Sequence, residues 1–180
     1  SSDLTRFRYQ QLEWFFLGLK VVLLNLRKNC LRLGLKKTIG KICQPLNTYT
    51  RFPEYYFCGR VIEPFIRQNS PDSPKILDVG SPKLFGLYLA YHYPVNVFLT
   101  DISRLNLDEY LILWDALKPG AKGEVIFIQH DGRAIPFSPD QFDVVYAMSV
   151  IEHIEGEAQD AKALLEIERV SKPDGQRVIS

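Results

Sequence analysis

The chain has 180 residues, of which 46% are hydrophobic and 24% are charged, a composition usual for soluble globular proteins. This length allows one domain with a sizeable core plus an appendage. The apolar run at 14–26 is too short to span a bilayer and contains Lys20 and Asn25, and no secretory signal is visible. Three cysteines without metal-binding spacing favour reduced thiols. We therefore expect a cytoplasmic protein that can lie at a membrane surface.

The net charge is only +1, but it is unevenly distributed. Residues 1–50 hold nine Lys and Arg against two Asp and Glu, whereas residues 51–180 hold 13 against 19. A basic arm on an acidic body indicates either two separate roles or an arm that meets an anionic partner.

The pattern of apolar residues predicts a helical arm over 4–42, with apolar side chains on more than one side. This helix could pack on its own domain, rest on a membrane surface as a basic amphipathic helix, or form a dimer seam. Residues 44–60 are rich in aromatics and contain two prolines, which is typical of a loop or lid. Their aromatic side chains could instead pack against the arm. Residues 61–68 are expected to form a short helix broken around Pro64.

A turn at 70–74 separates this arm and linker, residues 1–73, from a second unit, residues 74–180. There, apolar strands alternate with helices, which predicts an α/β, Rossmann-like parallel sheet with helices on both faces. The expected strands cover 75–80, 95–102, 124–131, 142–149 and 176–180, and the expected helices cover 84–93, 106–117 and 160–170.

Informative residues stand at the carboxyl ends of four predicted strands, which is where such sheets bind ligands. A glycine lets the backbone turn sharply and approach a ligand. A carboxylate after the second strand can hold a ribose diol, because it can accept hydrogen bonds from two hydroxyl groups at once. A carboxylate after the third strand can accept a hydrogen bond from the exocyclic amine of adenine. Each residue alone fits a turn, but four strand ends in order are harder to explain that way. These residues are Asp78, Gly80, Asp101, Asp131, Gly132, Met148 and Ser149.

Residues 75–180 resemble class I S-adenosylmethionine-dependent methyltransferases. The resemblance is most specific in DGRAIPFSPDQFDVVYAMSVIEHI (131–154) and ALLEIERVSKPDG (163–175). It is nearest to the small methyltransferases of ubiquinone and menaquinone biosynthesis. Residues 1–70 resemble no family that we can name.

The resemblance implies S-adenosylmethionine as cofactor and a role for each strand end. Asp78 and Gly80 would flank the methionine part, as would Met148 and Ser149. Asp101 would hold the ribose, with Ile102 beside the adenine, and Asp131 with the Gly132 amide would read the adenine. His153 would lie near the transferred methyl group as a general base, or else only cap or pack the strand–helix junction.

We therefore expect in-line methyl transfer to an unidentified small or lipid-like acceptor. The alternative is a degenerate, non-catalytic module of the same fold that binds a partner or a membrane surface. Nucleic acid is a weaker candidate acceptor, because the strands lack interleaved aromatic and basic residues.

The sequence departs from the family pattern in three places. The second and third glycines of the cofactor loop are replaced by Pro82 and Leu84, which is expected to affect the affinity for the cofactor. Gly86 could partly compensate if the loop is aligned with the family pattern in a different way. Ser149 stands where a metal-dependent subgroup has Glu, so we expect no metal. The family fold has seven strands, whereas this sequence ends within the fifth, so we expect a fragment of a longer protein.

Overall fold

The computed structural model of the protein describes residues 37, 40, 51–69 and 72–180. Apart from Lys37 and Gly40, the expected helical arm over 4–42 lies outside the described residues, as do Cys30 and Cys43. Its membrane and dimer interpretations therefore stay predictions. Within the described part of the chain, no helix combines the length and apolar character needed to cross a membrane.

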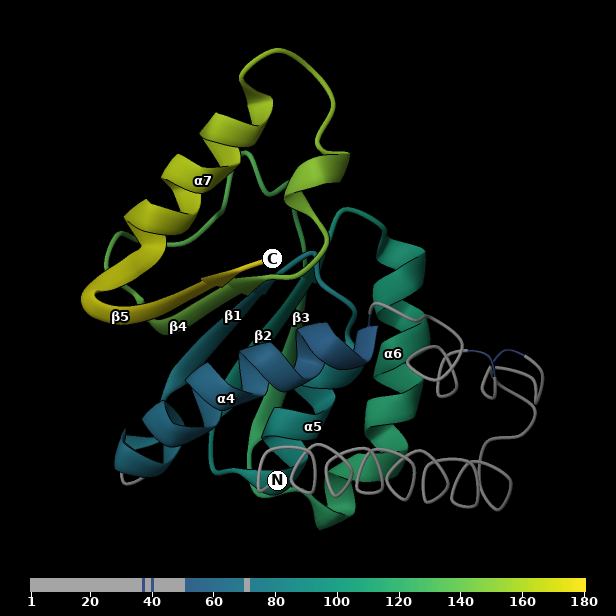
Figure 1. Cartoon of the computed structure of the whole chain (residues 1–180). Coiled ribbons are helices and arrows are strands. Elements are labelled where there is room, and N and C mark those ends of the chain that lie inside the picture. Colours follow the sequence, from purple (N-terminus) through teal and green to yellow (C-terminus); the bar gives the residue numbers. More distant parts are fainter. Residues whose placement is uncertain (1–36, 38–39, 41–50, 70–71) are drawn as a thin grey trace.

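Five parallel strands form one sheet in the order β3-β2-β1-β4-β5 (Figure 1). This confirms the predicted α/β, Rossmann-like architecture. The inner strands Lys75–Val79 and Phe142–Ala147 are short and largely buried, as expected for strands that are covered on both faces, whereas the edge strand Ser171–Ile179 is longer and mainly polar. The strands are β1 (Lys75–Val79), β2 (Asn96–Asp101), β3 (Glu124–Gln129), β4 (Phe142–Ala147) and β5 (Ser171–Ile179).

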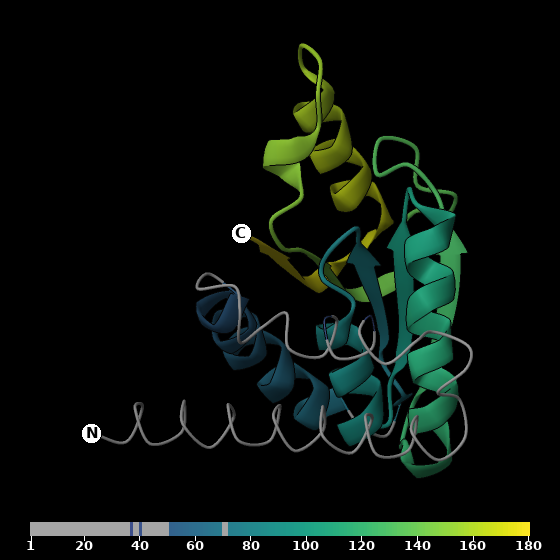
Figure 2. The ribbon, with the colours of Figure 1, turned by 90° about the vertical axis from the view of Figure 1, so that its right-hand side faces the viewer.

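Helices cover both faces of the sheet (Figure 1 and Figure 2). One apolar cluster joins α4, α5 and α6 to one face, and a second joins α7 to the other. Alternation along β1 divides its side chains between them, because Ile76 belongs to the first cluster while Leu77 and Val79 belong to the second. The helices are α4 (Arg51–Asn69), α5 (Leu84–His92), α6 (Arg104–Leu117) and α7 (Gln159–Val170), with short 3-10 turns η2 (Lys118–Gly120) and η3 (Ile151–His153).

The predicted loop or lid and the predicted short helix broken around Pro64 are both wrong for residues 51–69, which form the single helix α4. Pro64 lies inside it, on the exposed side, where water can reach the backbone that the proline ring interrupts. Tyr55 is buried and stacks on Phe85 of α5 at 5.7 Å between ring centroids, so this aromatic ring packs in the core. Burial of Cys58 and Ile62 on the same helix favours the helical conformation over the loop that the prolines indicated.

The register of the strands sets the position of the functional edge. Val79 of β1 pairs with Thr100 of β2, and Asp101 pairs with Gln129 of β3. The order of the strands reverses at β1, which lies between β2 and β4. The carboxyl ends of β1, β2, β3 and β4 therefore meet at the switch point where ligands bind in open α/β sheets.

Candidate active site

A cavity of about 500 Å³ opens at the carboxyl edge of the sheet. It lies beyond the ends of four strands, as the topology predicts. Several sequence-predicted residues line it, while Asp78, Met148 and Ser149 do not. The lining residues are Val79, Gly80, Thr100, Asp101, Ile102, His130, Asp131, Gly132, Arg133, Val150, His153, Ile154 and Glu155.

Gly80 forms the turn after β1 and has a φ of +73°, which L side chains rarely adopt. A Cβ atom there would lie 3.2 Å from Cγ1 of Val150, another cavity residue. The amide of Gly80 donates to the carbonyl of Thr100, which fixes the turn against β2. The glycine thus keeps this wall of the cavity free of a side chain.

Asp101 ends β2, and the loop into α6 holds its carboxylate. Oδ1 accepts from the amide of Ser103 at 2.8 Å, and Oδ2 accepts from Nδ2 of Asn106 at 2.6 Å. Ser103 is the N-cap of α6, and its hydroxyl accepts from the Asn106 amide. These contacts fix the orientation of a carboxylate that borders the cavity. Ile102 beside it is 67% exposed and so offers an apolar surface at the mouth of the cavity.

Asp131 follows β3 and forms a bidentate pair with Arg133. Oδ2 lies 2.6 Å from Nη2, Oδ1 lies 2.9 Å from Nε, and the Arg133 amide donates to Oδ1. These hydrogen bonds lower the pKa of Asp131 to about 2, so it is ionised at neutral pH. A ligand amine that reaches this carboxylate must share it with the guanidinium group.

His130 is a cavity residue that the sequence interpretation missed. Both of its ring nitrogens are buried and have no hydrogen-bond partner within the described residues. Burial lowers its pKa, so the ring is neutral at neutral pH. A histidine after a strand carries no distinctive spacing, so only the fold could reveal its position.

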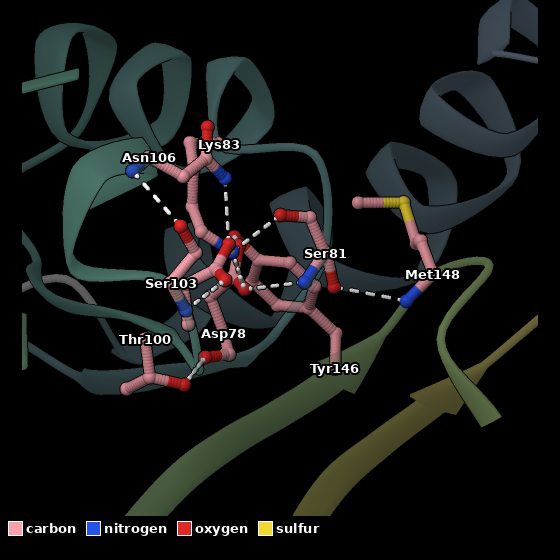
Figure 3. A network of polar contacts seen from close by, with 9 residues as sticks. Asp78, Ser81, Lys83, Thr100, Ser103, Asn106, Tyr146 and Met148 are labelled. Carbon is pink, nitrogen blue, oxygen red and sulfur yellow. Dashed lines mark hydrogen bonds and ion pairs between the residues drawn. The ribbon is translucent and has the colours of Figure 1, made fainter. Parts of the chain in front are cut away.

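Behind the cavity, Lys83 is fully buried and holds the end of β1 to the end of β2 (Figure 3). Its Nζ lies 3.1 Å from Oδ1 of Asp78 and 3.5 Å from Oδ2 of Asp101, and it also donates to the carbonyl of Ser81. The hydroxyl of Tyr146 donates to Oδ2 of Asp78 at 2.9 Å. Asp78 is therefore engaged inside the protein and does not reach the cavity.

Polar groups of Ser81, in the loop between β1 and α5, form hydrogen bonds with other parts of the protein. The Ser81 amide donates to Oδ1 of Asp78, and its hydroxyl accepts from the Met148 amide (Figure 3). Gly86 is not part of this loop, because it lies in α5, where an added Cβ would be 2.3 Å from Cδ2 of Leu99. It therefore allows close packing of the helix on β2 and does not compensate for Pro82 as a loop glycine.

The two predicted site residues after β4, Met148 and Ser149, contact the protein interior and do not line the cavity. Met148 is buried. Ser149 has a φ of +48°, and its hydroxyl donates to Glu54 of α4. His153 follows in η3 and borders the cavity with a side chain that is 75% exposed, 3.9 Å from Glu152. The structure thus places His153 at the cavity and leaves Met148 and Ser149 behind it.

The residues present fit a nucleoside-bearing ligand. A glycine turn, the carboxylate of Asp101 at the end of β2 and the carboxylate of Asp131 after β3 border one cavity. Carboxylates can accept from ribose hydroxyls and from an exocyclic amine. The neighbouring apolar side chains of Ile102 and Val150 can pack on a base.

Fold and cavity together define a Rossmann-like domain whose cavity, at the carboxyl edge of the sheet, suits a nucleoside. The family described as "Methyltransferase domain" matches residues 77–179, more than half of the chain. The chain belongs to this methyltransferase family, which implies S-adenosylmethionine as cofactor. No relative was found among curated proteins.

Solved structures agree with this assignment at the level of the fold. YcgJ from Bacillus subtilis is 20% identical with a TM-score of 0.51, and the match covers 65% of this chain and 50% of that one. The PH0226 protein from Pyrococcus horikoshii is 26% identical with a TM-score of 0.50, covering 75% and 61%. A candidate S-adenosylmethionine-dependent methyltransferase from Methanococcus maripaludis is 22% identical with a TM-score of 0.50, covering 67% and 56%. The chain spans between 50% and 61% of the length of these structures.

Proposed function

We propose that the protein is an S-adenosylmethionine-dependent methyltransferase that binds its cofactor in the cavity at the carboxyl edge of the sheet. The acceptor that we propose is a small or lipid-like molecule, and the nearest subgroup is that of ubiquinone and menaquinone biosynthesis. One observation carries the proposal: the carboxylates of Asp101 and Asp131 follow adjacent strands and border the same cavity as Gly80. That arrangement suits the ribose and the adenine of one nucleoside.

Each cavity residue then has a defined contribution. Asp101 accepts from the two ribose hydroxyls, in an orientation set by Ser103 and Asn106. Ile102 packs on the adenine, and Asp131 and the Gly132 amide form hydrogen bonds with the edge of the adenine. Asp78 and Met148 support the methionine end indirectly, through their hydrogen bonds to Ser81 in the loop that contains Gly80. Ser149 does so as the residue before Val150, whose side chain lies against Gly80.

S-adenosylmethionine, when bound, supplies an electrophilic methyl group on a positively charged sulfur. The acidic side chains Asp101, Asp131 and Glu155 around the cavity favour a cation there. His153 stands at the exposed side of the cavity, where it can accept a proton from the acceptor nucleophile. In-line methyl transfer requires the acceptor atom, the methyl carbon and the sulfur to be aligned. The residues that line the cavity therefore contribute mainly by orienting the two substrates and bringing them close together.

Calorimetry with S-adenosylmethionine tests this proposal. The wild-type protein is expected to bind, and Asp101→Ala to weaken binding by about tenfold or more, because two charge-assisted hydrogen bonds are lost. Asp108→Ala is the matched control, since Asp108 pairs with Arg104 on α6 and does not line the cavity. Unchanged affinity in Asp101→Ala refutes the ribose assignment.

The same titration separates catalysis from the non-catalytic alternative. Pro82 and the internal hydrogen bonds of Ser81 leave few loop amides for a ligand, which is the feature that favours a degenerate module. If the wild-type protein does not bind S-adenosylmethionine at millimolar concentration, the enzyme proposal fails and the partner-binding alternative stands.

A further inference from the structure

We propose that Lys83 is a positioning residue for the cofactor, acting through the carboxylate of Asp101. The inference rests on the proposed function and adds a residue that is neither a loop glycine nor a cavity residue. Lys83 occupies the position between the two substituted glycine positions, Pro82 and Leu84, in the loop after β1.

A buried ammonium group requires compensation, because transferring a charge from water into a protein interior is costly. The Lys83 side chain has no exposed surface, and its partners are two carboxylates and one carbonyl. The carboxylate of Asp78 is also fully buried, whereas that of Asp101 is 13% exposed. The site therefore contains one cation between two anions, and only the outer anion, Asp101, reaches the cavity.

The geometry gives Lys83 a specific effect on Asp101. Oδ2 of Asp101 faces both Nζ of Lys83, at 3.5 Å, and Nδ2 of Asn106, at 2.6 Å. Oδ1 accepts a hydrogen bond from the Ser103 amide. Two hydrogen bonds and the ion pair with Lys83 hold the carboxylate in one orientation, with its remaining lone pairs available for a bidentate contact to a ribose diol. Substituting Lys83 removes the cation among these three contacts and leaves the two hydrogen bonds.

The position of Lys83 explains how the loop can function without its second and third glycines. In a glycine-rich loop, the backbone approaches the ligand closely and donates amides. Here the loop is anchored from behind, because Lys83 ties the Ser81 carbonyl and Asp78 to the end of β2. Binding then depends on a preorganised carboxylate more than on loop amides.

Ribose selectivity tests this inference, because a merely structural lysine would not alter it. The probes are S-adenosylhomocysteine and its 2′-deoxy analogue, titrated by calorimetry into Asp78→Asn and into the double variant Lys83→Met/Asp78→Asn. The double variant replaces the buried ion pair by neutral groups, which avoids leaving Asp78 as an unpaired buried charge. Because both proteins carry the Asp78→Asn substitution, its effect on ligand affinity cancels in the comparison.

We expect the reference to bind the ribose ligand more tightly than the 2′-deoxy analogue. In the double variant this preference should be about tenfold smaller, because the ion pair that orients Asp101 is lost. An unchanged preference in the double variant overturns the inference while leaving the proposed function intact. A wild-type protein that binds neither ligand overturns both. If the double variant does not unfold cooperatively, Lys83→Gln, whose amide can still donate to Ser81, replaces it with the same expected loss of preference.

Discussion

Ser149, two residues after β4, donates a hydrogen bond from its hydroxyl to the carboxylate of Glu54 on α4, 95 residues earlier in the chain. Glu54 lies outside the region that matches the methyltransferase family, residues 77–179. The segment before the family domain is therefore connected to the strand end that leads into the cavity residues Val150 and His153.

Two substitutions at Ser149 separate this hydrogen bond from backbone strain. Both Ser149→Ala and Ser149→Gly remove the hydroxyl, but only glycine adopts the observed φ of +48° without strain. We expect the alanine variant to have a free energy of unfolding about 1 kcal/mol lower than the glycine variant. Chemical denaturation measures the difference. Equal stabilities would show that the left-handed conformation at Ser149 carries no cost.

Burial dominates the ionisation of Asp78 and produces a defined pH dependence. It raises the pKa of Asp78 from 3.8 to about 6, although the Lys83 ammonium acts in the opposite direction. Because this pKa is higher in the folded state, the contribution of Asp78 to stability is fully present below pH 3.8 and is lost as the pH rises through about 6. Relative to Asp78→Asn, the wild-type free energy of unfolding should therefore fall by about 3 kcal/mol across this window.

Urea denaturation of both proteins at several pH values between these limits measures that fall. The comparison with Asp78→Asn cancels the titration of carboxylates elsewhere in the chain. A difference between the two proteins that stays constant with pH would mean that the Asp78 carboxylate does not change its pKa on folding.

Gly86 provides a test of the packing of α5 on the sheet. An alanine Cβ there would lie 2.3 Å from Cδ2 of Leu99 and 2.9 Å from the hydroxyl oxygen of Tyr146. Although alanine favours helices, we expect overpacking to lower the free energy of unfolding by about 1–3 kcal/mol. Gly120→Ala, whose Cβ would meet only the side chain of Tyr91, is the control, with an expected change below about 0.5 kcal/mol. A stabilised Gly86→Ala protein would contradict this close contact.

His153 belongs to the acceptor side of the proposed site. Its side chain is 75% exposed, and its Nε2 lies 3.9 Å from the carboxylate of Glu152. We expect His153→Gln to bind S-adenosylhomocysteine within about twofold of the wild-type affinity, since exposed substitutions cost little. Calorimetry checks this. A large loss of affinity would make His153 a cofactor ligand and would remove the reason to place it beside the acceptor.

The sheet and its helices were predictable because their residues follow simple rules. Buried apolar runs bounded by turns predicted β1 and β4 to within two residues at each end. The position of Asp101 and Asp131 at the ends of adjacent strands follows from the same pattern and from the parallel order. That part of the site depends on local sequence and on topology.

Other features depend on tertiary contacts that one sequence does not reveal. The aromatic residues and prolines of 44–60 indicated a loop, and Pro64 indicated a break in a short helix over 61–68, but burial of Tyr55 and Cys58 stabilises α4 across both segments. A lysine in a loop usually lies in water, so the burial of Lys83 follows only from the two carboxylates that the fold places around it. The roles assigned to Met148 and Ser149 stay predictions, since neither lines the cavity.

A crystal structure of the protein with S-adenosylhomocysteine tests the central claim most directly. The account predicts density in the cavity beside Gly80, with the ribose hydroxyls within hydrogen-bond distance of Asp101 and the adenine next to Ile102 and Asp131. A ligand bound elsewhere, or a ribose that does not contact Asp101, would contradict it.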